Sequence, residues 1–296
     1  TLSTGTLTTT SGTITLNHTG MLDINADFTS TADFIVTGNG FDNTGGIGNV
    51  AGLSQLTISG PVTVGTNLST GTFVSTGTTF NTSSGATLTS TGTANITHTD
   101  TATIDGPMIT GPLTVDVPSI YTTATIDAAG TFTLSTNPSA GVTVFGANVT
   151  TTSSGDLIAL TGYDFTSTGY TLSVAGATQI DRVNAIATSA VTSGASITTN
   201  STSFVSDGLI QSLGGDITIT TVGNSIDIGA GATSFGMFTA TNMNSGPYDS
   251  TSAPILAGGA ITIHNGVNDP WTAGNVSTSG MTGSSITVTG GNMIFQ

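Results

Sequence analysis

The chain has 296 residues, of which 36% are hydrophobic and only 6% charged, and its formal net charge is −15. Arg182 is the one strong base and every acidic residue is Asp, so no cationic groove can form, which argues against nucleic acid or anionic lipid as partners. Cys is absent, which excludes disulfides and thiolate chemistry. No apolar run approaches the ~20 residues that a membrane helix needs, so membrane insertion is not expected.

The amino-acid usage favours β-structure. Thr, Val, Ile and Phe fit pleated strands, whereas the helix formers Lys and Glu are absent and Arg occurs once. Gly at 41 positions supplies frequent turns, and 8 Pro are too few for a collagen-like chain. We therefore expect an all-β protein with almost no helix.

The alternation of apolar residues is already present in the first part of the chain. Ile14-x-Leu16 and Leu22-x-Ile24 each place two apolar side chains on one side of an extended segment, because side chains alternate along a strand. A further strand is expected around residues 34–36. The Gly- and Asn-rich residues 38–52 break this rhythm and are predicted to form a loop that leaves the body.

The rhythm is clearest over residues 56–104. A small and a large apolar residue recur every eight positions, at Thr78-x-Phe80, Ala86-x-Leu88, Ala94-x-Ile96 and Ala102-x-Ile104. A unit this short and polar cannot bury its apolar face alone, so it must stack on copies of itself. Three such segments would make one rung of roughly 20–25 residues. Phe80 and Ile104 would then stack on one face.

The series continues to about residue 175 and is then interrupted. Residues 176–195 are rich in Ala and contain Arg182. We expect an irregular segment here, with a short helix as the alternative. In the later part, residues 214–219 and 258–263 both read Gly-Gly-x-Ile-Thr-Ile. Two polar stretches, 242–254 and 264–274, are predicted to project as loops.

Together these segments predict a single elongated parallel β-helix, or β-solenoid, over residues 1–296, with projecting loops. Inward Ile, Leu, Val and Phe would form a dry core, and outward Thr, Ser and Asn would form ladders of like residues. The competing architecture is a string of immunoglobulin-like sandwiches, which requires a buried Trp and units of ~100 residues. The one Trp, Trp271, falls in a polar stretch, and no such units are visible.

The solenoid rhythm, the Thr, Ser, Gly and Asn bias, the Gly-Gly-x-Ile-Thr-Ile segments and the lack of Lys resemble one known group. They are similar to filamentous-haemagglutinin-type adhesins and related secreted bacterial fibre proteins. The resemblance implies a right-handed β-helix that is exported to the cell surface or the extracellular space and serves in attachment or in a matrix. The secretion domain of that family is not recognisable in this sequence.

One cation site can be suggested. Asp23-x-Asn25-x-Asp27 would place three oxygen-bearing side chains on one strand face, and Ca²⁺ prefers such ligands. The alternative is a solvated polar face. No other cofactor is expected. His18 and His98, like His264, are expected to be exposed polar residues and not metal ligands.

Two aromatic residues are candidates for contact with a ligand or partner. Tyr248 and Trp271 fall in the two predicted loops of the later part, where an aromatic ring can stack on a sugar or anchor a partner protein. The alternative is a loop folded back over the solenoid, with the ring covering apolar surface.

The sequence therefore favours a non-enzymatic extracellular structural protein, either an adhesin or a self-assembling fibre or matrix subunit. Copies are expected to stack end to end, and a glycan or other cell-surface ligand is a possible partner. Two alternatives stay open: a calcium-stabilised surface-layer protein and a glycan-binding or glycan-cleaving β-helix. In the cleaving alternative, Asp100 with Asp105, or Asp23 with Asp27, would supply the acid–base pair. No catalytic residue is predicted.

Overall fold

The computed structural model describes residues 2–4, 6–223, 225–244, 247–250, 254–266, 271–273, 276–278, 285–289 and 293–295. The contacts between residues divide the chain into unit 1, Thr1–Asn137, and unit 2, Pro138–Gln296. All regular elements in the described residues are β-strands, and no helix there could cross a membrane. The continuity of one solenoid over residues 1–296 stays a prediction.

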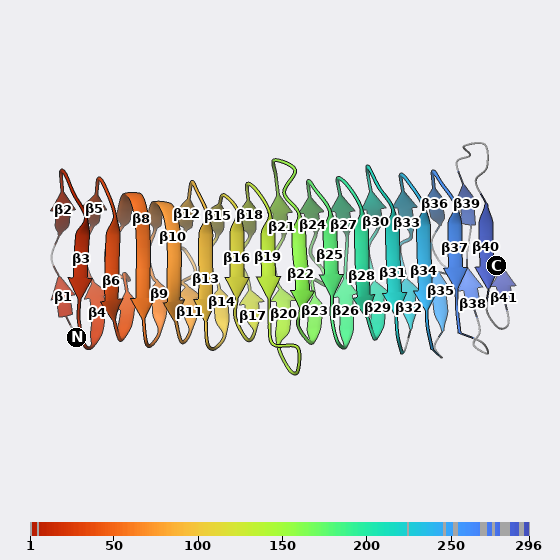
Figure 1. The fold of residues 1–296 in the computed structure, drawn as a ribbon, viewed down its shortest axis with the longest axis horizontal. Coiled ribbons are helices and arrows are strands. Elements are labelled where there is room, and N and C mark those ends of the chain that lie inside the picture. Colours follow the sequence, from red (N-terminus) through yellow and green to blue (C-terminus); the bar gives the residue numbers. More distant parts are fainter. Residues whose placement is uncertain are drawn as a thin grey trace. The chain divides into compact units, whose positions relative to one another are not determined.

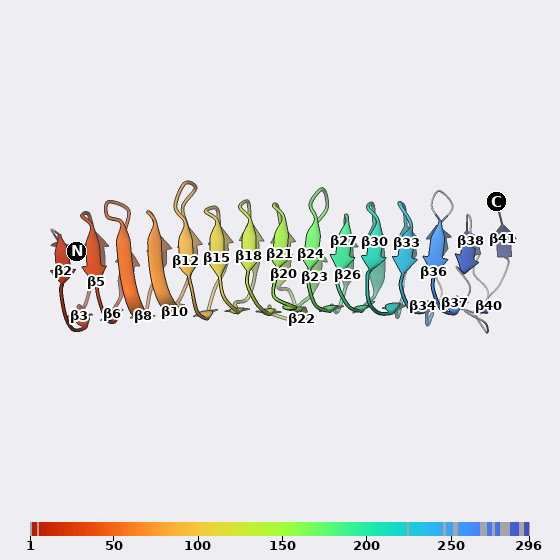
Figure 2. The ribbon, with the colours of Figure 1, turned by 90° about the horizontal axis from the view of Figure 1, so that it is seen from above.

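Each unit is a parallel β-solenoid. The chain coils so that every rung adds one short strand to each of three faces, here named the A, B1 and B2 faces, and each strand pairs in parallel with its equivalents in adjacent rungs. Figures 1 and 2 show the strands of each face side by side within a unit. The predicted fold class is therefore confirmed, while the right-handed sense of the coil stays a prediction.

Unit 1 contains three series of strands. The A face consists of β1 (Leu2–Thr4), β4 (Met21–Ile24), β7 (Gly40–Asp42), β9 (Val62–Val64), β11 (Phe80–Thr82), β14 (Ala102–Ile104) and β17 (Ile120–Thr122). The B1 face consists of β2 (Leu7–Thr9), β5 (Phe28–Ser30), β12 (Leu88–Ser90), β15 (Met108–Thr110) and β18 (Ile126–Ala128). The B2 face consists of β3 (Ile14–Asn17), β6 (Phe34–Gly38), β13 (Ala94–His98), β16 (Leu113–Asp116) and β19 (Phe132–Ser135). The long strands β8 (Gly48–Ile58) and β10 (Leu68–Gly77) run from B1 into B2.

Unit 2 repeats the arrangement. Its A face consists of β20 (Val142–Phe145), β23 (Asp164–Thr166), β26 (Ala185–Thr188), β29 (Ser203–Ser206), β32 (Ile226–Ile228), β35 (Tyr248–Ser250), β38 (Trp271–Ala273) and β41 (Met293–Phe295). The B1 face consists of β21 (Val149–Thr151), β24 (Leu172–Val174), β27 (Val191–Ser193), β30 (Ile210–Ser212), β33 (Ala232–Ser234), β36 (Ile255–Ala257) and β39 (Val276–Thr278). The B2 face consists of β22 (Leu157–Thr161), β25 (Thr178–Asp181), β28 (Ile197–Ser201), β31 (Ile217–Thr221), β34 (Phe238–Asn242), β37 (Ile261–His264) and β40 (Ile286–Thr289).

The eight-residue spacing corresponds to successive strands of one rung. Phe80, Leu88 and Ile96 lie in β11, β12 and β13, one on each face. The rung length varies from 18 residues, between paired Val62 and Phe80, to 25 residues, between paired Ile261 and Ile286. The expected stacking of Phe80 on Ile104 is wrong, because Phe80 pairs with Ala102. Corners of unequal length shift the register away from a strict multiple of eight.

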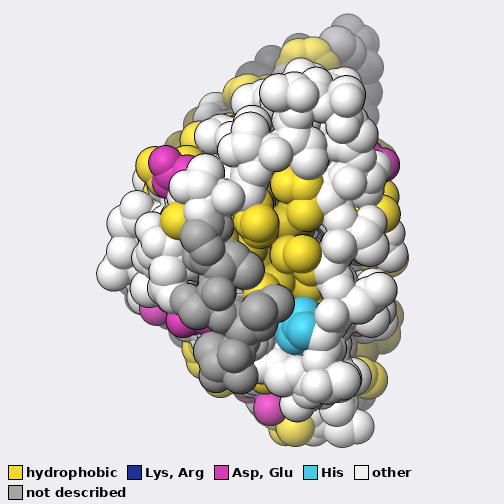
Figure 3. Space-filling model, turned by 90° about the vertical axis from the view of Figure 1, so that its left-hand side faces the viewer, with side chains coloured by type: hydrophobic (Ala, Val, Ile, Leu, Met, Phe, Trp, Pro, Cys, Tyr) yellow, Lys and Arg dark blue, Asp and Glu magenta, His cyan; other side chains and the backbone are white. Residues whose placement is uncertain are grey.

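The core of each unit is a stack of inward-facing apolar side chains. Most three-residue strands alternate between buried and more exposed positions, as the pleat requires. In unit 1, the rings of Phe28 and Phe34 stack with centroids 4.7 Å apart, and Phe41 meets Phe34 at its edge. Figure 3, which faces the N-terminal end of unit 1, shows apolar side chains gathered in the middle of that end.

The predicted loop at residues 38–52 is wrong. These residues form β7 and the first part of β8. The glycines reflect crowding between rungs rather than a loop: a Cβ on Gly48 would lie 2.2 Å from the ring of Phe28. A Cβ on Gly40 would lie 2.6 Å from the sulfur of Met21. Glycine is therefore used where a large side chain of the preceding rung fills the available space.

The predicted irregular segment at residues 176–195 is also wrong. It contains β25, β26 and β27, which continue all three faces of unit 2. Its small Ala side chains occupy ordinary strand and corner positions. Because Ala gives only a weak apolar alternation, the strands of this rung could not be recognised from the sequence.

The predicted loops at 242–254 and 264–274 hold strands as well. Tyr248–Ser250 forms β35 and Trp271–Ala273 forms β38, both on the A face. The positions 245–246, 251–253, 267–270 and 274 lie outside the described residues. Within the described parts, each stretch contributes a strand to the A face.

Candidate functional site

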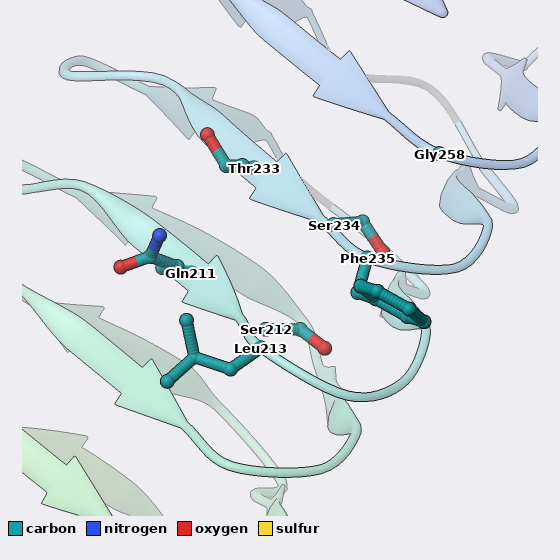
Figure 4. Close-up of a pocket in the computed structure, with 7 residues that line it drawn as sticks. All are labelled: Gln211, Ser212, Leu213, Thr233, Ser234, Phe235 and Gly258. Carbon is teal, nitrogen blue, oxygen red and sulfur yellow. The ribbon is translucent and has the colours of Figure 1, made fainter. Parts of the chain in front are cut away.

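The most distinctive surface feature is a groove on unit 2, where the B1 face turns the corner toward B2. It has a volume of about 410 Å³ and is lined by Gln211, Ser212, Leu213, Thr233, Ser234, Phe235 and Gly258. These residues come from three successive rungs at β30, β33 and β36. Figure 4 shows Gln211 and Thr233 projecting from adjacent strands, with Leu213 and Phe235 just beyond the strand ends.

Two large apolar side chains are exposed in this groove. Phe235 is 67% exposed and Leu213 is 55% exposed, although each lies directly beside a buried Ser. Gly258, at the corner after β36, has no side chain to cover Phe235, and a Cβ there would lie 2.2 Å from the Phe235 carbonyl oxygen. The groove therefore presents an aromatic face and an aliphatic one to solvent.

The buried serines fix the walls of the groove. The Ser212 hydroxyl donates to the carbonyl oxygens of Ala195 and Gly215, each at 2.7 Å. The Ser234 hydroxyl donates to the carbonyl oxygens of Gly215 and Met237, at 3.1 and 2.8 Å. These bonds tie one rung's strand end to the corner of its neighbour. The corner that carries Phe235 is thus held by hydrogen bonds, which limits the entropy lost on binding.

The lining of the groove is neutral. Its polar side chains are amide and hydroxyl groups, and none of the seven lining residues is ionisable. Asp216 lies nearby, but its carboxylate accepts a hydrogen bond from the Met237 amide at 2.7 Å. The groove can therefore offer hydrogen bonds and apolar contact, whereas an anionic ligand would meet a protein of net charge −15.

A second groove, of about 370 Å³, lies on the B1 face of unit 1. It is lined mainly by Asn, Ser and Thr side chains of β8, β10 and β12 and the corners beside them, with Ile47 exposed at one side. The Asn67 side chain there accepts from the Thr87 amide at 2.9 Å. This groove lacks an aromatic ring and is the less distinctive of the two.

The predicted calcium ligands do not share one strand face. Asp23 lies in β4, but the strand ends at Ile24, so Asn25 and Asp27 fall in the corner that follows. The Asp27 carboxylate accepts from the Ile47 amide at 2.9 Å. Among the described residues, no three His, Cys, Asp or Glu side chains are grouped closely enough to hold a metal ion. The proposed binding of Ca²⁺ stays a prediction, although the geometry on which it rested is wrong.

The predicted exposure of Tyr248 is wrong. Its side chain is 1% exposed and faces the core of the A face, at the position that Ile226 holds in the rung before. Burial raises the pKa of the Tyr248 hydroxyl. Trp271 pairs with Tyr248 in the next rung, and its side chain lies outside the described residues. Tyr248 therefore cannot stack on a ligand without unfolding its rung.

Of the two suggested acid–base pairs, the first, Asp100 with Asp105, is divided between the two ends of one strand. Asp100 and Asp105 flank β14 at opposite ends, where they serve local roles. Asp100 accepts from the Thr101 amide at 2.8 Å, and Asp105 accepts from the Thr123 hydroxyl at 2.7 Å.

Sequence reasoning missed a recurring role of Asp and Asn at corners. In eight cases among the described residues, the side-chain oxygen accepts a hydrogen bond of 2.7–3.0 Å from a backbone amide 20–23 residues later, in the next rung. The pairs are Asp27 with Ile47, Asp33 with Leu53, Asn43 with Gly65, Asn67 with Thr87, Asn148 with Thr171, Asp156 with Ala177, Asp164 with Ala185, and Asp216 with Met237. A short side chain suits this bond, which gives a physical reason for Asp in place of Glu. The corner positions of Asp and Asn, one rung before the amides that they bind, were the sequence signal that could have indicated this role.

Arg182 is buried inside unit 2. One terminal nitrogen donates to the carbonyl oxygens of Ala159, Thr161 and Asp181, at 2.6–2.9 Å, and the other donates to the Thr143 hydroxyl. The guanidinium also lies 5.4 Å from the ring centroid of Phe165. Burial lowers the pKa of Arg182 to about 10, with the charge of Asp181 opposing, so the group is still cationic at neutral pH. Its role is structural: it satisfies carbonyls of two adjacent rungs.

His98 is buried in unit 1, contrary to the expectation that it is exposed. Its Nε2 lies 2.9 Å from the Ser75 hydroxyl, and its ring is 5.5 Å from that of Phe80. Burial lowers the pKa of His98 from 6.5 to about 4, opposed by a backbone hydrogen bond with Thr79. The imidazole is therefore neutral at pH 7.

This burial predicts an acid-sensitive unit 1. The unfolded chain takes up a proton on His98 below about pH 6.5, before the folded chain does, so stability should fall between pH 6.5 and 4, by up to about 2–3 kcal/mol. Urea unfolding at a series of pH values measures this. His98→Gln, which cannot titrate, serves as the control and should lose less stability over the same range. Equal losses in both proteins would contradict the prediction.

Comparison with known proteins identifies no relative. No protein-family model, no curated protein and no solved structure matches this chain.

Proposed function

We propose that this protein is a non-enzymatic extracellular structural protein, an adhesin or fibre subunit, that contacts a neutral glycan through the groove at Phe235. The observation that supports this most directly is the pair of exposed apolar side chains, Phe235 and Leu213, beside Gln211 and Thr233. An aromatic face covers the apolar side of a sugar ring, and amide and hydroxyl groups bond its hydroxyls. A stiff solenoid would present this groove on the surface of a cell or matrix.

Glycan binding can be tested by screening the protein against neutral and sialylated oligosaccharides, followed by calorimetry. Phe235→Ala is expected to weaken the binding of a neutral glycan about tenfold or more, because it removes the stacking surface. Tyr170→Ala is the matched control, since Tyr170 is another exposed aromatic residue of unit 2 outside the groove. No binding of any neutral glycan, or equal losses in the two variants, would contradict the proposal.

Self-assembly is part of the same proposal. Successive rungs within each unit meet through the same parallel pairing and the same apolar stack, so a rung of another copy can add in the same way. We expect copies to stack end to end along the solenoid axis. Electron microscopy at increasing concentration measures this: filaments one solenoid wide support the proposal, and monomers at all concentrations contradict it.

A surface-layer protein is the second candidate. The observation that favours it is the in-register pairing of carboxylates on the A face, Asp23 with Asp42 in unit 1 and Asp227 with Asp249 in unit 2. Partial burial, together with the charges of Asp249 and Asp207, raises the pKa of Asp227. A cation between copies would relieve this repulsion. Planar arrays that dissolve on addition of a calcium chelator would favour this candidate over the fibre.

A further inference from the structure

The B2 face of unit 2 carries a regular array of Thr side chains. Five successive strands, β28, β31, β34, β37 and β40, each present two outward positions in register with those of the next strand. The first column is Thr198, Thr218, Thr239, Thr262 and Thr287, and the second is Asn200, Thr220, Thr241, His264 and Thr289. Figure 1 shows these strands in one row, and Figure 2 shows several of them along one side.

The spacing of this array is set by the sheet. Neighbouring strands lie ~4.8 Å apart, and two outward residues of one strand lie ~6.6 Å apart. The array therefore repeats in two directions. The equivalent outward positions on the B1 face have the same backbone pairing but carry different side chains, as in the series Gln211, Thr233 and Leu256. Eight of its ten side chains are Thr.

The Thr side chains are held rigidly. The inward neighbours Ile217, Ile219 and Phe238 are fully buried, as are the core residues of β37, so the strands beneath the array cannot shift independently. Thr is β-branched and its χ1 angle is restricted. Both the methyl and the hydroxyl groups are consequently fixed before any ligand binds, which lowers the entropy cost of binding.

The hydroxyls at the centre of the array have no protein partner. Within the described part of the chain, Thr218, Thr220, Thr239 and Thr241 make no side-chain hydrogen bond, although all four are partly exposed. By contrast, the corner hydroxyls of Ser212 and Ser234 are bonded to backbone carbonyls. The central hydroxyls must therefore bond water, and they impose their own spacing on it.

We propose that this array binds ice. The ~4.8 Å repeat across the strands is close to the repeat of hexagonal ice along its a axis, and the ~6.6 Å repeat along each strand is about a tenth shorter than the repeat along the c axis, so water bonded to the hydroxyls can join the crystal. None of the ten residues of the array is Asp, Lys or Arg, and a charged group there would favour disordered hydration instead. The methyl groups between the hydroxyls restrict the positions open to water. This binding is independent of the proposed glycan contact, which lies in the B1 corner.

The proposal can be tested by freezing a dilute solution slowly and measuring how much protein enters the ice. Thr218→Lys combined with Thr239→Lys should reduce the fraction in ice about tenfold, because two bulky charges disrupt the centre of the array. The matched control is Thr150→Lys combined with Thr192→Lys, at outward positions of β21 and β27 on the B1 face of the same unit. Circular dichroism melts check that both variants fold.

The adsorption plane provides a second measurement that needs no variant. The chain contains no Lys and no Cys, so an amine-reactive dye labels the terminal amine alone and leaves the array unmodified. The labelled protein should adsorb to a prism plane of a single ice crystal, whose surface contains both lattice repeats. Exclusion of the unmodified protein from ice, adsorption without a preferred plane, or equal losses in the two Lys variants would overturn the proposal.

Discussion

Replacing Phe34 with Ala is expected to destabilise unit 1 by about 3–5 kcal/mol, the usual cost of removing a large buried aromatic side chain. Phe34 is fully buried, lies between Ile14 and Ser54 of the adjacent rungs, and contacts the rings of Phe28 and Phe41. Parallel strands on both sides fix the backbone, so the cavity cannot collapse. Urea unfolding followed by far-ultraviolet circular dichroism measures the loss.

Ile35→Ala is the matched control for this prediction. Ile35 is the next residue of the same strand, but its side chain points outward and is only partly buried. We expect it to cost less than about 1 kcal/mol, since it removes apolar contact without opening an internal cavity. Similar losses for Phe34→Ala and Ile35→Ala would mean that the alternation along β6 is wrong.

Replacing Arg182 with Ala is expected to destabilise unit 2 by about 2–4 kcal/mol. The substitution leaves the carbonyls of Ala159, Thr161 and Asp181 without their shared donor in a buried position, and each such loss costs about 1–3 kcal/mol before water enters. It also removes the contact with the ring of Phe165. The substitution also removes the desolvation cost of burying the guanidinium charge. The expected loss of stability is therefore smaller than the summed cost of three unsatisfied carbonyls.

Two further substitutions separate the hydrogen bonds of Arg182 from its volume. Arg182→Met keeps an apolar stem but has no donor, while Arg182→Lys keeps a charge but has no planar fork. Both are expected to lie between the unmodified protein and Arg182→Ala in stability. Amide hydrogen exchange should show the loss of protection in β22 and β25, which the guanidinium joins. If Arg182→Met were as stable as the unmodified protein, the hydrogen bonds would contribute nothing.

The fold class could be predicted from the sequence because the inward-facing apolar residues recur at a regular spacing. Phe80, Leu88 and Ile96 follow at intervals of eight, and each lies on a different face of the same coil. Side-chain alternation and the need to stack are local rules, so they could be applied without a structure. The register between rungs could not be predicted, because it depends on corner lengths that vary from rung to rung.

The misassigned segments share a physical cause. Gly48 occupies a core position whose space is filled by Phe28 of the rung before. Tyr248 occupies a position that Ile226 holds in the preceding rung, and its polar neighbours made it resemble a loop residue. In both cases the residue is explained by what lies above or below it, about 20 residues away, and not by its neighbours in sequence.

The candidate site was the least predictable feature. Phe235 and Leu213 follow inward serines and are separated by a full rung in sequence, so nothing local joins them into a groove. The Thr array is different, because Thr218-x-Thr220 and Thr239-x-Thr241 are visible in the sequence. That these residues form an array could be seen only from the strand register, which places Thr218 opposite Thr239 and Thr220 opposite Thr241 on adjacent strands.

The account depends on the parallel stacking of rungs in a defined register, and cysteine cross-linking tests it directly. The chain has no Cys, so Asn95→Cys combined with Thr114→Cys creates one pair, at positions opposite each other in β13 and β16. Their Cα atoms should lie ~5 Å apart, within the range that a disulfide spans. Asn95→Cys with Asp116→Cys, displaced by two residues, is the control. Rapid disulfide formation in the first pair and little in the second is the predicted result, and equal or absent cross-linking in both would contradict the solenoid.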